Sequence, residues 1–111
     1  MDTGFLDLNI GCVVYKKDFK TGKLDSNWHF AFNDKFVTGT GKAIGSPGEK
    51  FSGKYSITYY NSKGIDVGSY DLIITESNNS YRLQWYQNGT LKCTGIGMLS
   101  ENLLIAGWMK V

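Results

Sequence analysis

The only histidine of the chain, His29, follows shortly after Asp25 and Ser26, and these three residue types perform nucleophilic catalysis in Ser-His-Asp hydrolases. Such a triad depends on where the three side chains lie in space, and nearby sequence positions do not establish it. In residues 27–32 an aromatic side chain occupies every second position, which places His29 on the face opposite Trp28. If Trp28 faces a core, His29 faces away from it. We therefore favour a polar role for His29, at a surface or in a lumen, over catalysis.

Residues 48–54 fit the phosphate-loop pattern GxxxxGK, which in nucleotide-binding proteins holds phosphates at a helix N-terminus. The next residue is Tyr55, where that loop needs a Ser or Thr hydroxyl for magnesium. The pattern also continues into an alternating segment that is typical of a strand. A Pro-Gly turn that leads into a strand is the better interpretation, and we predict no cofactor.

Metal binding and paired-carboxylate catalysis both need several side chains that converge on one point. The chain offers one histidine and two widely separated cysteines, Cys12 and Cys93, so we predict no metal site. Among the carboxylates, only Asp7 and Asp71 lie well within predicted strands. Both alternate with apolar residues, so we expect both to point away from the core. No catalytic residue is predicted.

The chain has 111 residues, with 12 basic and 10 acidic side chains and a net charge of +2. Arg82 is the only arginine, and the lysines are scattered, which argues against a nucleic-acid partner. No apolar run approaches the ~18–20 residues of a membrane helix. No secretory signal is recognisable, so we expect a cytoplasmic protein without a membrane span and with both cysteines reduced and buried.

Short alternating segments, each followed by a turn signal, recur along the chain. The clearest turn is Asn88-Gly89, a pair that tolerates the positive φ angles of a type I′ hairpin turn. Short connections favour antiparallel neighbours, and closure into a barrel removes exposed edges. We therefore predict an all-β fold, a single domain over residues 1–111 that forms an antiparallel, eight-stranded, up-and-down meander barrel. The predicted strands cover residues 6–15, 27–32, 36–43, 51–60, 68–75, 80–86, 90–99 and 103–110.

Aromatic side chains share one parity with the aliphatic residues of the predicted strands. An eight-stranded barrel is just wide enough to be filled by side chains or to hold one small ligand. Four tyrosine hydroxyls on one inner face are many for a packed core, because a buried Tyr or Trp needs a partner for its polar atom. Two interpretations stay open: solid packing, and a cavity for a small amphipathic ligand. The candidate ligand-binding residues are Trp28, Tyr55, Tyr59, Tyr70, Tyr81 and Trp85.

The last predicted strand is apolar on both faces. Leu104, Ala106 and Trp108 share one parity, and Leu103, Ile105 and Met109 share the other. Such strands are covered on both sides or pack against another subunit. Other strands also carry outward apolar residues, and we predict a homo-oligomer that forms through the outer barrel wall. The outward set is Tyr60, Ile73, Tyr86, Ile96 and Met98.

Four segments occur in order along the second part of the chain: Phe51-Ser52-Gly53-Lys54-Tyr55, Leu83-Gln84-Trp85, Gly95-Ile96-Gly97-Met98 and Ala106-Gly107-Trp108. The series resembles a group of small, uncharacterised bacterial proteins whose expected architecture is the calycin type of the avidin and lipocalin barrels. The segment around Trp28 is similar to the tryptophan-bearing first strand of those barrels, although here it is the second strand. The resemblance implies the fold and a general capacity to bind. No avidin binding motif is present, so it implies no biotin-site residue and no ligand.

We therefore predict a non-enzymatic binder of a small apolar or amphipathic molecule inside the barrel. The alternative is an oligomerising or protein-interaction module with a packed interior, and a small hydrolase or isomerase ranks last. A cavity of roughly several hundred Å³ would favour the binder over the module. Two acids, or His29, converging on that cavity would favour the enzyme.

Overall fold

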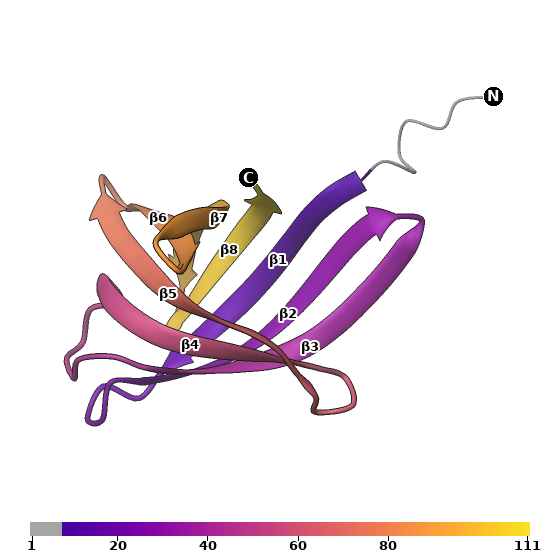
Figure 1. The fold of residues 1–111 in the computed structure, drawn as a ribbon. Helices are drawn as coiled ribbons and strands as arrows, with labels where there is room; N and C mark the ends of the chain where they lie inside the picture. The colour runs from indigo at the N-terminus through magenta and orange to yellow at the C-terminus, as the bar shows by residue number, and fades with distance from the viewer. Residues whose placement is uncertain (1–7) are drawn as a thin grey trace.

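The computed structural model describes residues 8–111, which form eight strands and no helix (Figure 1). The strands are β1 (Leu8–Lys17), β2 (Lys23–Asn33), β3 (Lys35–Ile44), β4 (Gly53–Asn61), β5 (Asp66–Ser77), β6 (Ser80–Gln87), β7 (Thr90–Ser100) and β8 (Leu103–Lys110). The predicted antiparallel, up-and-down, eight-stranded barrel is confirmed. The largest difference in boundaries is at β2, which begins at Lys23 rather than at residue 27.

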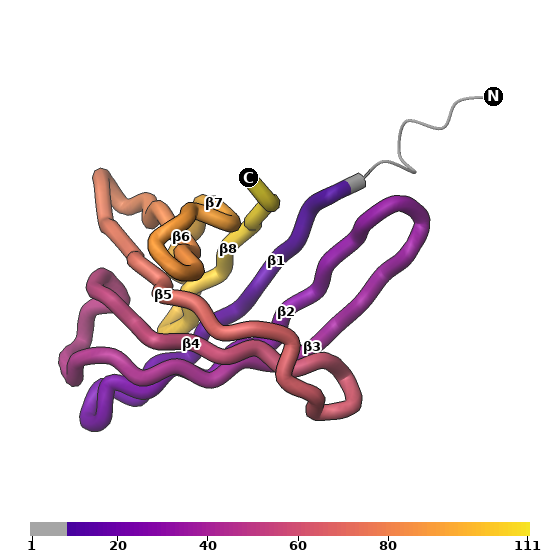
Figure 2. Tube along the Cα trace, in the orientation of Figure 1, coloured from indigo at the N-terminus to yellow at the C-terminus, as the bar shows by residue number. Residues whose placement is uncertain are grey.

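The sheet closes because β1 pairs with both β2 and β8. Val13 of β1 lies opposite Trp28 on one side and opposite Ala106 on the other. Figure 2 shows the end of the chain returning along β8 beside β1. Closure pairs the backbone groups that an open sheet would leave free at its edges.

Tight turns join consecutive strands where asparagine and glycine predict them. Asn88 and Gly89 have φ angles of 51° and 78°, the signs that a type I′ turn requires, and this predicted hairpin is confirmed. Asn33 turns β2 into β3 with a φ of 53°. Asn78 and Asn79 turn β5 into β6, also with positive φ. Asparagine adopts this conformation more readily than most residues that carry a side chain.

Alternate residues of the strands face the barrel interior and form the core. Leu72, Leu83 and Leu104 are fully buried there, and β1 contributes Val13 and Tyr15. Aromatic side chains supply much of the remaining core volume, because the inward positions of β2, β4 and β6 carry Trp or Tyr. Burial of this apolar surface is the main favourable term in the stability of the barrel.

Cys12 lies on the outer wall of β1, where it is exposed, because Val13 and Tyr15 occupy the inward positions. The expectation of two buried thiols is therefore wrong for Cys12. Ile10 and Val14 share its outward face, so β1 is apolar on both sides and alternation alone does not show which side points inward.

One end of the barrel, which we call the closed end, is covered by the loop 45–52 between β3 and β4. The amide of Gly48 donates to the carbonyl of Phe19 at 2.9 Å, which holds this loop on the β1–β2 connection. Phe51, which belongs to this loop, is buried in the core and makes an edge-to-face contact with Phe19. The opposite end, which we call the open end, holds the β2–β3, β4–β5 and β6–β7 connections and the C-terminal end of β8.

Candidate functional site

A cavity of about 120 Å³ lies inside the barrel toward the open end. All three tryptophans of the chain border it, together with three of the seven tyrosines. The exposed residue Lys110 also borders the cavity, which places its mouth near the end of β8. The aromatic lining consists of Tyr15, Trp28, Tyr59, Tyr70, Trp85 and Trp108.

The structure brings four of the six predicted binding residues to this cavity: Trp28, Tyr59, Tyr70 and Trp85. The other two, Tyr55 and Tyr81, are buried nearer the closed end. The hydroxyl of Tyr55 donates to the carbonyl of Phe51 at 2.8 Å and so anchors the loop of the closed end. Tyr55 therefore has a structural role in the closed end.

Contacts between side chains of different strands fix the aromatic walls of the cavity. Trp108 of β8 stacks on Phe30 of β2, with ring centroids 4.6 Å apart. The indole N–H of Trp28 donates to the carbonyl of Thr40 on β3 at 2.9 Å. Both indoles are thereby held against the wall, so the centre of the barrel stays open near this end.

A polar group lies in the otherwise aromatic lining. The hydroxyl oxygens of Tyr15 and Tyr59 are 2.6 Å apart, and either can be the donor. The indole N–H of Trp85 donates to the hydroxyl of Tyr59, also at 2.6 Å. These three side chains come from β1, β4 and β6, which are far apart in the sequence and meet only because the barrel closes.

Burial raises the pKa of both hydroxyls in this group. Desolvation is the main reason that the pKa of Tyr15 and that of Tyr59 lie well above the ordinary tyrosine value. The nearby hydroxyl of Tyr15 raises the pKa of Tyr59 further, whereas the hydrogen bond from Trp85 lowers it. Both hydroxyls therefore stay protonated near neutral pH and act as hydrogen-bond donors, not as bases.

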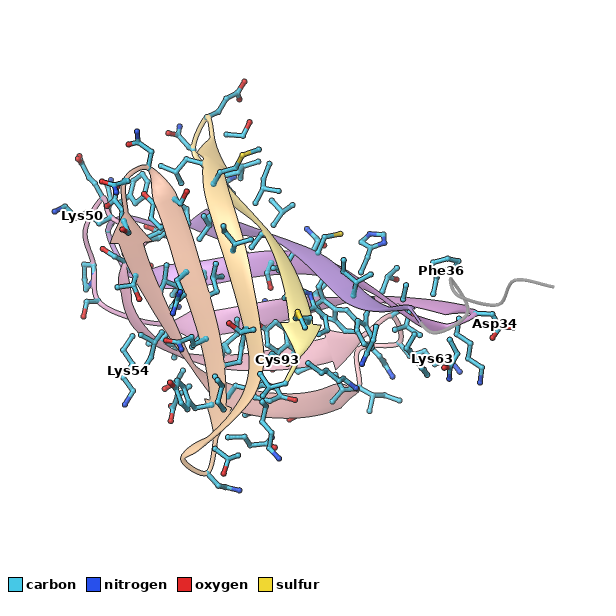
Figure 3. The ribbon with its side chains drawn as sticks, turned by 90° about the horizontal axis from the view of Figure 1, so that it is seen from above. Asp34, Phe36, Lys50, Lys54, Lys63 and Cys93 are labelled. Carbon is cyan, nitrogen blue, oxygen red and sulfur yellow. The ribbon has the colours of Figure 1, made fainter. Side chains whose placement is uncertain are left out.

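The mouth of the cavity carries a thiol and an ammonium group. Cys93 is half-buried, and burial raises the pKa of its thiol while Lys110 acts in the opposite direction. The ammonium of Lys110 lies 5.0 Å from the ring centroid of Phe30, within cation–π range. Figure 3 shows Cys93 beside the C-terminal end of β8. The mouth therefore combines aromatic surface with one positive charge.

Sequence reasoning missed five of the lining residues: Val13, Tyr15, Cys93, Trp108 and Lys110. Trp108 could have been predicted to line the lumen, because it shares parity with Leu104 and Ala106, and these two residues point into the barrel. Tyr15 had no such signal, because both faces of β1 are apolar. Its part in the cavity follows from the register that places β1 between β2 and β8.

The side chains that could have formed a triad do not converge. His29 is exposed on the outer wall of β2, where Cys12 and Thr38 are its cross-strand neighbours. Ser26 has the opposite parity and is buried, with an Oγ that finds no hydrogen-bond partner among residues 8–111. Asp25 is exposed. This separation across the two faces of β2 removes nucleophilic catalysis by these residues.

The GxxxxGK pattern and the strand carboxylates, which the sequence also offered as functional candidates, lie in ordinary structural positions. Lys54 of the GxxxxGK pattern is exposed on β4, and a strand follows the pattern where a phosphate site needs a helix. Asp71 is exposed on the outside of β5, as predicted, and Asp7 lies outside the described residues. Within residues 8–111, no group of three or more His, Cys, Asp or Glu side chains could hold a metal ion.

A second hollow, of about 790 Å³, lies on the outer surface across strands β2 to β6. It is wide and more polar than the lumen, and Thr58 and Ser69 on its floor are hydrogen-bonded to each other at 2.7 Å. Tyr60 and Tyr86 border it. Because it opens broadly to solvent and its floor hydroxyls are already paired, it is a weaker candidate than the lumen.

Comparison of the chain with protein-family models, with curated proteins and with solved structures finds no match. In residues 8–111 no helix has the length and apolar character that crossing a bilayer requires. Function is therefore inferred from the geometry of the barrel and its lining.

Proposed function

We propose that this barrel is a non-enzymatic binder of a small apolar or amphipathic ligand, held in the cavity at the open end. The observation that carries the proposal is the cavity, because a solidly packed barrel would have none. At about 120 Å³ it is smaller than the several hundred Å³ that would favour the binder over the module on size alone, so the proposal depends on the chemistry of its lining as well. Aromatic walls provide apolar contact area, and the Tyr15–Tyr59 pair provides a polar anchor of the kind that fixes a ligand's orientation. The closed antiparallel topology also supports our assignment of the barrel to the calycin type.

The cavity volume limits the size of the ligand. A volume of about 120 Å³ is below the roughly 300–1,000 Å³ of sites for drug-sized molecules. It is close to the ~150 Å³ of an engineered apolar cavity that binds benzene. A single aromatic ring therefore fits, and a longer molecule would extend through the mouth toward Lys110. That ammonium would meet a polar or anionic end of an amphipathic ligand.

Tryptophan fluorescence tests the proposal, because every tryptophan of the chain borders the cavity. Titration with phenylacetylene, a small apolar ring compound, should change the emission in a saturable way. Cys93→Leu puts a larger side chain into the cavity and should abolish the change. Cys12→Leu makes the same substitution on the exposed outer wall and should preserve it. An equal response from the two variants would refute binding in the lumen.

No observation favours the enzyme. The described cavity lining contains no carboxylate and no imidazole, and the raised pKa values of Tyr15 and Tyr59 make them poor bases near neutral pH.

The outer wall supports a second candidate function, a homo-oligomerising module. Apolar residues of β7, β8 and β1 lie side by side there, with Met109 opposite Ile10 and Met98 opposite Ile105. Ile96, Met98, Met109 and Ile10 are each more than half exposed in the single chain. Contiguous exposed apolar surface of this kind marks interaction sites. Sedimentation over a range of protein concentrations tests this function independently of ligand binding.

A further inference from the structure

The polar group in the cavity lining carries one more polar hydrogen than its internal hydrogen bonds use. Trp85, Tyr15 and Tyr59 supply three polar hydrogens. The N–H of Trp85 is used on the hydroxyl of Tyr59, and one hydroxyl hydrogen is used between the two tyrosines. One hydroxyl hydrogen is left over, whichever tyrosine donates to the other. The hydrogen bonds of the described residues provide no acceptor for it.

The leftover hydrogen lies where an unsatisfied donor is costly. Tyr15 is fully buried, and Tyr59 is partly buried, with its hydroxyl 2.6 Å from that of Tyr15. Neither hydroxyl loses its proton near neutral pH, because desolvation favours the neutral form of both. A buried donor without an acceptor loses the free energy that water would otherwise supply. The free-energy cost of this unpaired hydrogen therefore depends on whether the molecule in the cavity, water or ligand, accepts a hydrogen bond from it.

We propose that the cavity selects a single-ring aromatic ligand that presents a hydrogen-bond acceptor, such as a carbonyl, nitrile or ring nitrogen, to the Tyr15–Tyr59 hydroxyl pair. This inference depends on the proposed function, since it assigns the chemistry of the ligand for the same cavity. The acceptor enters first, toward the hydroxyl pair, and any polar or anionic end of the ligand lies near Lys110 at the mouth.

Other ligand chemistries fit less well. A purely apolar ring displaces water from the cavity and leaves the hydroxyl hydrogen without a partner. A ligand that offers only a donor leaves the leftover hydroxyl hydrogen without an acceptor. An acceptor uses the leftover hydrogen and leaves the bonds among Trp85, Tyr15 and Tyr59 intact. The aromatic ring suits the walls because indole and phenol rings favour stacked or edge-to-face contacts.

Benzonitrile and phenylacetylene test the inference as a matched pair, because they have nearly the same shape and only the nitrile is an acceptor. In a purely apolar cavity the more apolar phenylacetylene would bind more tightly. We expect benzonitrile to bind more tightly instead, by about tenfold, as measured by tryptophan fluorescence. Equal or tighter binding of phenylacetylene would overturn the acceptor inference. If neither compound binds, the proposed function itself fails.

The infrared stretching band of bound benzonitrile gives a second measurement, because a hydrogen bond moves the nitrile band away from its position in a hydrocarbon solvent. In the wild-type barrel we expect the nitrile band at the position of a hydrogen-bonded nitrile. Tyr86→Phe removes a hydroxyl on the outer wall, outside the cavity lining, and should leave the band unchanged. Tyr15→Phe/Tyr59→Phe should shift it toward the hydrocarbon position, and an unchanged band in this double variant would assign the bond to water instead. Should the double variant not fold, a hydrocarbon-like band in the wild type would still refute the inference.

Discussion

Trp108 covers Gly11, the residue paired with it on the neighbouring strand β1. A Cβ atom at Gly11 would overlap the indole of Trp108, so only glycine leaves room for the ring in this orientation. The same arrangement occurs across β2 and β3, where Trp28 covers its paired residue Gly39. Large rings therefore lie along the wall above glycines on adjacent strands. This accounts for an open lumen in a barrel that is rich in aromatic residues.

Gly11→Ala should displace the indole of Trp108 into the lumen and fill the cavity. We expect a loss of stability of about 1–3 kcal/mol, because an added methyl group forces its neighbours to shift. We also expect the fluorescence response to phenylacetylene to disappear. Thermal or denaturant unfolding measures the first effect and titration measures the second.

Gly107→Ala is the matched control. The atom nearest to a Cβ at Gly107 would be the carbonyl oxygen of Gly11, at 3.8 Å, an ordinary contact. Gly107 also belongs to the outward-facing residues of β8, so the change leaves the cavity untouched. If Gly11→Ala and Gly107→Ala behave alike, the indole of Trp108 is not held in place by the glycine.

Trp85→Ala should destabilise the barrel by roughly 3–5 kcal/mol, because it removes a large buried aromatic side chain. Trp85 is buried at 4% exposure and also donates to the hydroxyl of Tyr59. Tyr86→Ala, the adjacent residue with the opposite parity, should cost only about 1 kcal/mol. Wild-type stability in Trp85→Ala, measured by denaturant unfolding, would show that the inward face of β6 is assigned wrongly.

The fold could be predicted from the sequence because its signals are local. Alternation at period two identified eight strands, and Asn88-Gly89 identified a hairpin whose φ angles the structure confirms. Short connections then left few topologies other than a meander. Alternation does not fix the inward face where both faces are apolar, and for that reason Cys12 was placed in the core and Tyr15 was overlooked.

The cavity itself could be predicted only in part, because it depends on register. Four candidates on β2, β4, β5 and β6 do line it, since their parity matches the aliphatic core. Whether a residue borders the cavity or packs beneath it depends on its height along the barrel. Tyr55 and Tyr59 share one face of β4, yet Tyr55 reaches the loop of the closed end and Tyr59 reaches the hydroxyl of Tyr15.

Alkaline pH should destabilise the barrel, whereas the range from pH 7 to about 9 should leave its stability nearly constant. Burial raises the pKa of Tyr55 to about 12 and raises those of Tyr15 and Tyr59 well above the ordinary value. Above pH ~10 the unfolded chain therefore binds fewer protons than the folded chain at these sites, and the free energy of unfolding falls as pH rises. Denaturant unfolding at several pH values measures the free energy of unfolding, and tyrosinate absorbance measures the ionisation of the tyrosines. Constant stability through pH 11 would contradict the burial of these hydroxyls.

Ile96→Lys should weaken self-association of the chain by at least about tenfold if the outer wall is the interface, because a lysine would be buried between two apolar surfaces. Ile44→Lys is the control, since Ile44 is equally exposed at 67% but lies on β3, away from β7, β8 and β1. Sedimentation equilibrium compares the two variants with the wild type. A monomeric wild type at every concentration, or equal effects of the two variants, would exclude this wall as the interface.

The two cysteines should differ in reactivity and in their response to ligand. Cys12 is exposed on the outer wall and should be alkylated quickly by iodoacetamide. Cys93 should react more slowly, because it is half-buried beside the cavity and burial raises its pKa, which leaves less thiolate. Saturating benzonitrile should slow the alkylation of Cys93 further and leave that of Cys12 unchanged. Mass spectrometry of the digested protein measures both rates, and a Cys12→Ser variant isolates the slower one. Protection of both cysteines would indicate a general stabilisation of the fold, whereas protection of Cys93 alone places the ligand in the lumen.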